Sequence, residues 1–196
     1  MNKVIVLLLT LFISQSLFSQ ELQQDYKTAS NAGKFIETQG SILKVESYTD
    51  YVISSGLISG TVEIIPGMIT NIRNGEKTSY IIVNSYYQDS HSVIYTSYID
   101  FDEIPACIEA LEYIINTETT SIPSNYTRVF FKTRDQLEIG AQIYVTGYNE
   151  RSWKTSITHM KYVRKPSFEI SIKKLPKIVE ALKESMALLE EKLKSE

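Results

Sequence analysis

The stretch that decides the fold occurs twice, first as IDFDEIPACIEAL (Ile99–Leu111) and again as ISIKKLPKIVEAL (Ile170–Leu182). The two copies align without a gap at an offset of 71 residues, and both have a proline at the seventh position. In each copy apolar residues first alternate and then recur every three or four residues. Because a period of 2 is typical of a strand and a period of 3.6 of a helix, each copy predicts a strand that runs into a helix.

We therefore expect an α+β fold of two tandem antiparallel β-β-β-β-α repeats, related by a pseudo-twofold axis and ending in a long helix. The first repeat spans residues 41–116, and the second spans residues 126–196. The Ser/Thr-rich linker 117–125 joins them. One repeat alone would leave sheet edges and one sheet face uncovered. Two copies are therefore expected to pair their edges or to share one layer of helices.

Two dipeptides predict turns inside the first repeat. Pro66-Gly67 favours a tight turn between two short strands, because proline presets φ and glycine accepts φ > 0. Asn74-Gly75 favours a hairpin with a type I′ turn. The segment Ile143–Tyr148 also echoes Ile81–Tyr86, at an offset of 62 residues. This smaller offset predicts a longer third strand or turn in the second repeat.

The two predicted helices differ in length. Before the first one, Asp100 is expected to look outward, and Asp102 to act as the N-cap. The second helix has an apolar stripe at alternating spacings of four and three residues, which continues beyond the length of the first. Its last turns either pack on residues 20–40 or the first repeat, or form a homodimer contact through Met186, Leu189 and Leu193.

The N-terminus has the features of a secretory signal peptide, predicted over residues 1–19. Lys3 precedes the apolar run Val4–Ile13, and cleavage can follow Ser16 or Ser19. The alternative is a retained N-terminal anchor. No later segment approaches the roughly 18 apolar residues of a membrane span. We expect an exported protein, periplasmic or secreted, with residues 20–40 as a polar leader and no membrane span after signal removal.

Charge is divided unevenly along a chain whose formal net charge is only −3. Residues 78–127 contain no Lys or Arg, whereas residues 151–177 contain eight cations and a single acid, Glu169. Opposite charges on the two repeats can steer their association. The alternative is two solvated faces of opposite sign.

The basic stretch also contains aromatic residues, as a platform for single-stranded nucleic acid or another polyanion requires. Trp153 is interpreted as a core anchor rather than as part of such a platform, because it shares a strand face with apolar residues. The candidate binding residues are Arg151, Lys154, Lys161, Tyr162, Arg164 and Lys165.

No catalytic or metal-binding constellation is recognised. His91 and His159 have no partner at ligand spacing, and Cys107 lies among apolar helix positions. We expect no cofactor and a non-catalytic binding or structural module, whose partner is an envelope protein or a polyanion. An enzyme remains an alternative and predicts a deep cleft that gathers at least two titratable groups.

Several segments resemble uncharacterised secreted proteins of the Bacteroidota. They are the signal end Phe18-Ser19-Gln20, the entry Gly40–Lys44, the segment Phe131–Gly140 and the two strand-to-helix stretches. This resemblance covers most of the mature chain and implies no function. More distantly, the repeated unit resembles that of the whirly and PC4-like single-stranded DNA binders, which implies a similar topology. Fold alone does not determine function.

Overall fold

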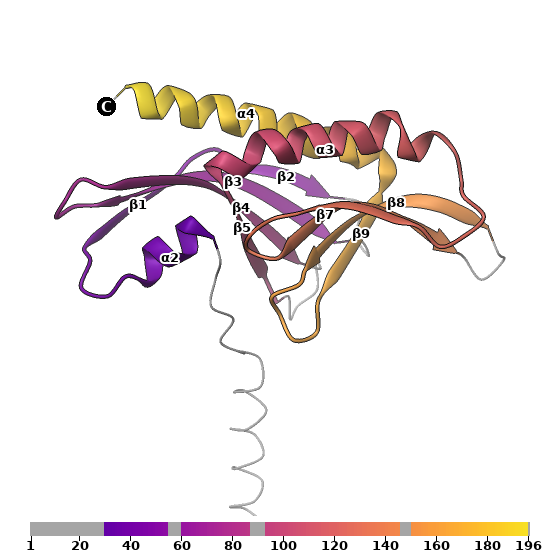
Figure 1. The fold of residues 1–196 in the computed structure, drawn as a ribbon, viewed down its shortest axis with the longest axis horizontal. Helices are drawn as coiled ribbons and strands as arrows, with labels where there is room; N and C mark the ends of the chain where they lie inside the picture. The colour runs from indigo at the N-terminus through magenta and orange to yellow at the C-terminus, as the bar shows by residue number, and fades with distance from the viewer. Residues whose placement is uncertain (1–29, 55–59, 87–92, 146–149, 196) are drawn as a thin grey trace, which may run out of the picture.

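The first half of the chain forms a five-stranded antiparallel sheet, the first sheet (Figure 1). The computed structural model describes residues 30–54, 60–86, 93–145 and 150–195, so the predicted signal peptide lies outside the described residues. The order is β1-β3-β4-β5, and β2 pairs with β3 as well. The strands are β1 (Leu43–Ser47), β2 (Tyr51–Ser54), β3 (Thr61–Asn71), β4 (Lys77–Tyr86) and β5 (Tyr95–Asp100).

The second half forms a four-stranded antiparallel sheet, the second sheet, in the order β6-β7-β8-β9. Its strands are β6 (Arg128–Lys132), β7 (Leu137–Val145), β8 (Arg151–His159) and β9 (Ser167–Ser171). The three described helices are α2 (Asn31–Glu37), α3 (Ile104–Asn116) and α4 (Leu175–Lys194). Three 3-10 turns complete the described elements: η1 (Phe101–Glu103), η2 (Glu118–Thr120) and η3 (Ile172–Lys174). The α+β class predicted from the sequence is confirmed.

Each sheet closes in the same way. The last strand of the first sheet, β5, leads through η1 into α3, and the last strand of the second sheet, β9, leads through η3 into α4. Each helix has a proline in its first turn, where no intrahelical hydrogen bond needs the missing N–H. The first residues of the two helices, Ile104 and Leu175, are both fully buried. The predicted change from strand to helix is therefore present at both places.

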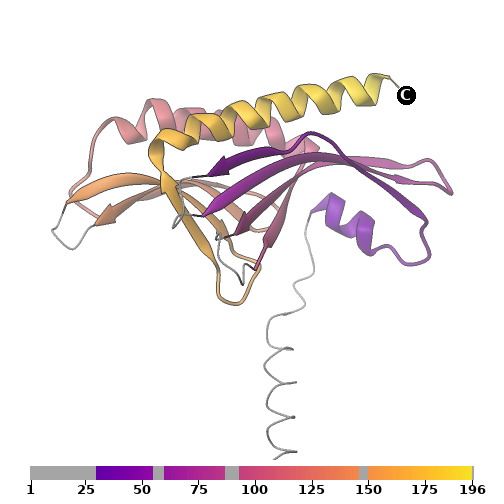
Figure 2. The ribbon, with the colours of Figure 1, turned by 180° about the vertical axis from the view of Figure 1, so that it is seen from behind.

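The two long helices lie side by side on one face of both sheets and run in opposite directions (Figures 1 and 2). Each helix packs on the sheet of the other half of the chain: α3 contacts β6 and β7, and α4 contacts β2 and β3. One hydrophobic core therefore joins both sheets and both helices. The helix that follows each sheet therefore covers the apolar face of the other sheet.

The packing of α4 on the first sheet involves the last turns of this helix. Leu189 is fully buried within the chain, while Met186 packs at the edge of the core and Leu193 is 43% exposed. The extra length of α4 thus covers the first sheet. Of the three residues predicted to form a homodimer contact, Leu189 is already inside the molecule. No described helix is long and apolar enough to span a membrane.

The predicted turn at Pro66-Gly67 is wrong, because β3 continues through both residues. The neighbouring edge strand is interrupted here instead: β1 ends at Ser47 and β2 begins at Tyr51, and the Tyr48 N–H donates to the Pro66 carbonyl at 2.9 Å. Gly67 is needed for space, since a Cβ there would lie 2.8 Å from the ring of Tyr80. Pairing on both sides of β3 overrides the local turn preference.

The predicted hairpin at Asn74-Gly75 is confirmed and joins β3 to β4, although its turn is not type I′. Only Gly75 of the pair has a positive φ, of 72°, whereas a type I′ turn requires positive values at both central residues.

The predicted equivalence of Ile81 and Ile143 is wrong. Ile81 lies on β4, next to the last strand of the first sheet, whereas Ile143 lies on β7, two strands before the last strand of the second sheet. Ile81 pairs with Ile99, and Thr155 on β8 pairs with Ile170. Thr155 therefore holds the place of Ile81. The connection from β4 to β5 is the longer one, so the additional residues lie in the first half.

Candidate functional site

Side chains seal the edge of the first sheet where it meets the second sheet. The Tyr162 hydroxyl accepts a hydrogen bond from the Thr96 N–H at 3.1 Å and donates one to the Thr96 carbonyl at 3.0 Å. The Asp135 carboxylate accepts a hydrogen bond from the Tyr98 N–H at 2.8 Å. Lys161 in turn donates to Asp135 at 2.6 Å. These side chains satisfy backbone groups of β5 that would otherwise offer an open sheet edge.

Two of the six predicted binding residues, Lys161 and Tyr162, therefore have a structural task. The Lys161 ammonium lies 5.2 Å from the ring centroid of Tyr98 and 5.7 Å from that of Tyr162, so its charge is shared between an acid and two rings. Burial raises the pKa of the Tyr162 hydroxyl, which keeps this hydrogen-bonding group neutral.

Asp100 is buried, contrary to the outward position predicted for it. Its side chain does lie on the sheet face opposite α3 and α4, as alternation predicted, but α2 covers that face. The two carboxylate oxygens accept hydrogen bonds from the backbone N–H groups of Asn31 at 2.7 Å and Ala32 at 3.0 Å. One carboxylate thus attaches α2 to the end of β5.

Arg134 joins the acidic stretch at residues 100–103 to the second half of the chain. Its guanidinium forms ion pairs with Asp100 at 3.1 Å and with Asp102, and its backbone N–H donates to Glu103 at 2.8 Å. Glu103 also accepts a hydrogen bond from the Asp100 N–H at 3.2 Å. The predicted N-cap role of Asp102 is therefore wrong, because its carboxylate is exposed and pairs with Arg134. This acidic cluster is therefore engaged in contacts that join α2, β5 and Arg134.

The described residues contain one histidine, His159, and one cysteine, Cys107, and both are buried. The His159 Nδ1 lies 2.9 Å from the Ser97 hydroxyl, and the rings of Tyr95, Tyr162 and Phe168 surround the imidazole. Burial lowers the pKa of His159 to about 3. Burial also raises the pKa of Cys107 to about 12, so this thiol is a protonated core group, as predicted. His91 lies outside the described residues.

The other four predicted binding residues do not form one patch. Arg151 begins β8, whereas Arg164 and Lys165 follow its far end, in the turn to β9. A nine-residue strand spans about 30 Å, so these two groups are far apart. Lys154 lies between them on β8, with its ammonium 6.0 Å from the ring of Tyr144.

Trp153, beside Lys154 on the same strand, is the predicted core anchor. It is 6% exposed and belongs to the main hydrophobic core. Its indole N–H donates to the Ser121 carbonyl at 2.6 Å, which satisfies the polar end of a buried ring.

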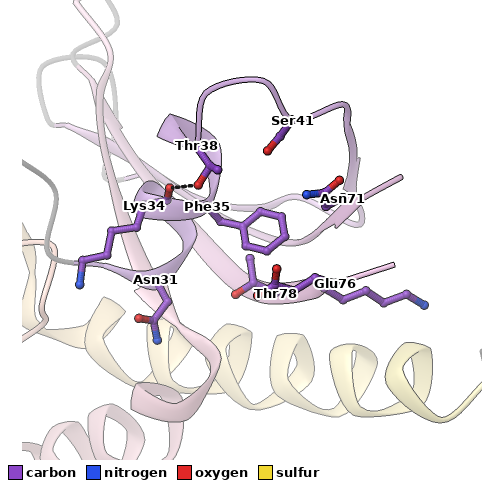
Figure 3. A pocket seen from close by; sticks show the side chains of 9 residues that line it. Asn31, Lys34, Phe35, Thr38, Ser41, Asn71, Glu76 and Thr78 are labelled. Atoms are coloured by element: carbon purple, nitrogen blue, oxygen red, sulfur yellow. Dashed lines mark hydrogen bonds between the residues drawn. The ribbon is translucent and has the colours of Figure 1, made fainter. Parts of the chain in front are cut away.

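A pocket of about 340 Å³ lies between α2 and the β3–β4 hairpin, on the face of the first sheet opposite α3 and α4. Figure 3 shows the ring of Phe35 projecting from α2 into this space, towards Asn71 and Thr78. The ring is held from behind by a small apolar cluster of Ala32, Ile69 and Tyr80. The pocket is lined by Asn31, Lys34, Phe35, Thr38, Ser41, Asn71, Glu76, Lys77 and Thr78.

Several polar side chains in this pocket have no partner among the described residues. The side chains of Asn31, Ser41 and Thr78 make no hydrogen bond there, and the Asn71 amide uses only its oxygen, which accepts from the Arg73 N–H at 3.0 Å. Polar groups of a folded chain that converge on a cavity without internal partners are available to a ligand. We call this place the α2 pocket.

Sequence reasoning identified no member of the α2 pocket as a binding residue. The polar members come from a helix start, a loop and two strands, at spacings that match no motif. Lys34 lies inside α2 and Thr78 inside β4, so the members share no local sequence signal.

The described residues contain no group of three or more His, Cys, Asp or Glu side chains placed to hold a metal ion. No protein-family model, no curated protein and no solved structure shows significant similarity to this chain.

Proposed function

We propose that the protein is an exported, non-catalytic binding module built from two tandem β-β-β-β-α repeats. Export rests on the N-terminal signal features. The duplication is supported by the matching antiparallel order of the last three strands of each sheet, β3-β4-β5 and β7-β8-β9. It is also supported by the closing stretches, whose 3-10 turns and helices begin 71 residues apart. The reciprocal packing of α3 and α4 is what a twofold relation between two copies requires.

The observation that carries the binding function is the contrast between the titratable groups and the α2 pocket. Asp100, Glu103, Arg134, Asp135 and Lys161 are bound to one another or to backbone groups at the sheet junction. The α2 pocket instead presents, around an aromatic ring, polar side chains that make no hydrogen bond with the described residues. Binding a ligand satisfies such groups, whereas acid–base catalysis needs a positioned titratable pair.

Capture of partners by the mature chain from its native envelope, followed by mass spectrometry, tests this proposal. Phe35→Ala removes the ring of the α2 pocket, and Phe130→Ala is the matched control because it removes a ring on the second sheet that is 43% exposed. We expect one set of captured molecules to be lost with Phe35→Ala and retained with Phe130→Ala. Equal capture by both variants, or chemical conversion of the captured molecule, contradicts the proposal.

A polyanion or a single-stranded nucleic acid is the second candidate ligand. The favouring observation is that Arg164 and Lys165 are exposed in the β8–β9 turn and form no ion pair with the described residues. Their double reversal, Arg164→Glu with Lys165→Glu, leaves the sheet junction intact because Lys161 is kept. If this candidate is correct, affinity for heparin or single-stranded DNA falls steeply with salt, and the double variant lowers that salt dependence. Salt-independent or absent binding eliminates it.

A further inference from the structure

We infer that the α2 pocket binds a neutral, hydroxylated ligand of the size of a sugar ring, as part of a longer saccharide. This inference rests on the proposed function as a binding module and adds the chemical class of its ligand.

The ring of Phe35 supplies an apolar wall that is fixed in place. Ala32, on the same short helix, and Tyr80, on β4, pack behind it, and Asp100 anchors that helix through two hydrogen bonds. An aromatic face carries negative potential and attracts the weakly positive C–H groups of a neighbouring molecule. A sugar ring offers C–H groups on its faces and hydroxyl groups around its rim, so it fits a fixed ring bordered by polar side chains.

The polar border suits hydroxyl groups better than ions. Hydroxyl and amide side chains both donate and accept hydrogen bonds, as do the hydroxyl groups of a sugar. Ser41 and Thr78 contribute hydroxyls, and Asn31 contributes an amide, that have no partner in the described part of the chain. A ligand with fixed donor or acceptor character would leave part of this border unsatisfied, at a cost for each buried group.

The charges near the pocket do not concentrate one sign. Lys34 extends away from the ring of Phe35 (Figure 3). The Glu76 carboxylate is held by the Asn74 amide at 3.3 Å, and Lys77 has a partner elsewhere in the chain. With two cations and one carboxylate at its rim, the pocket gives no strong preference for an anion.

The size of the site also fits. A volume of about 340 Å³ is at the lower end of the range for small-molecule pockets, which suits one ring rather than a large ligand. A second depression of about 310 Å³ adjoins it and shares Asn31, Lys77 and Thr78. A neighbouring sugar unit has room there, beside Phe101.

The test is a titration of the isotope-labelled mature chain with cellobiose, N,N′-diacetylchitobiose, maltose, mannobiose and, as a charged probe, glucuronic acid, followed by NMR. We expect chemical-shift changes confined to residues 31–41, 71–79 and 100–102, which line the two depressions, with at least one neutral disaccharide. Phe35→Ala should weaken this binding about tenfold, since a ring contact contributes up to about 1.5 kcal/mol. Thr78→Val, which keeps the shape of the strand residue, should weaken it about fivefold through one lost hydrogen bond. Phe130→Ala should have no effect.

No shift with any neutral disaccharide, shifts elsewhere on the chain, or unchanged affinity in Thr78→Val overturns the inference. Stronger binding of glucuronic acid than of the neutral probes also overturns it. If these probes fail while Phe35→Ala still removes a captured envelope protein, the binding module remains and only the ligand class is wrong. If a probe is hydrolysed, the non-catalytic assignment is wrong as well.

Discussion

The two halves of the molecule share their helix-facing side and differ on the opposite side. In both closures the residues that face the core are apolar and buried: Ile104 and Leu111 in α3, Leu175 and Leu182 in α4. On the opposite face Asp100 corresponds to Ser171. Because Tyr80 pairs with Asp100 and Lys154 pairs with Ser171, Tyr80 and Lys154 hold the same place in the two sheets.

This difference determines what each half can attach. Tyr80 is fully buried beneath α2, and Asp100 binds the first backbone N–H groups of that helix. Lys154 is half-buried, and no described helix covers that face of the second sheet. The side facing the helices forms the shared core in both halves. The opposite side carries α2 in the first half and a polar sheet face that no described helix covers in the second.

The largest expected difference between the halves is a pH effect of His159, whose place in the first sheet is held by Ser85. Burial lowers the pKa of His159 to about 3, against about 6.5 in the unfolded chain. Below about pH 6.5 the His159 imidazole therefore binds a proton in the unfolded state but not in the folded state. The free energy of unfolding decreases as the pH falls. By pH 3 the loss is on the order of 4 kcal/mol.

Urea unfolding of the wild type and His159→Gln between pH 7 and pH 3 measures this effect. The variant keeps a hydrogen-bonding side chain beside Ser97 and does not titrate, so its stability should change less with pH. If the free energy of unfolding changed equally with pH in both proteins, folding would not lower the pKa of His159.

The exchanged helices predict the next largest effect. Leu111 and Leu189 are both fully buried, on α3 and α4. Replacement of either by Ala should cost about 2–5 kcal/mol through the cavity that it leaves. Hydrogen exchange should show lower protection in both sheets for each variant, because one core joins them. Leu193→Ala, at an exposed position of α4, is the control and should change stability by less than about 0.5 kcal/mol. Loss of protection in one sheet alone would contradict a shared core.

The acidic residues between β5 and α3 predict a smaller effect on the free energy of unfolding. Asp100→Asn keeps the side-chain shape but weakens both hydrogen bonds to α2 and the ion pair with Arg134, which should cost about 1–3 kcal/mol. Asp102→Asn is the matched control, since the Asp102 side chain is 65% exposed and pairs with the same arginine. It should cost at most about 1 kcal/mol. Equal losses in thermal or urea unfolding would mean that burial of Asp100 is unimportant.

Sequence periodicity predicted the two strand-to-helix stretches, because apolar residues recur every two residues in the strand and every three or four residues in the helix. It could not predict which sheet each helix covers. An apolar stripe such as Leu175, Val179 and Leu182 requires an apolar partner, and both sheets offer one. The exchange of helices follows from the orientation of the sheets, which no local pattern contains.

Local patterns failed where long-range contacts decided the conformation. Pro66-Gly67 has turn chemistry, yet pairing with β1, β2 and β4 extends it. Alternation placed Asp100 on the correct face, but the covering helix α2 is distant in sequence. The α2 pocket was invisible for the same reason: Phe35, Ser41 and Thr78 meet only after α2 docks on the first sheet.

Complementation between the two halves tests the central claim most directly. Residues 30–125 and 126–196 are expressed separately, and the fragments are examined by circular dichroism and NMR alone and after mixing. Because each sheet lacks its covering helix when alone, we expect neither fragment to give dispersed amide signals, and a mixture at equal concentration to restore the spectrum of the intact chain. A fragment that folds by itself, with its own helix on its own sheet, would contradict the account.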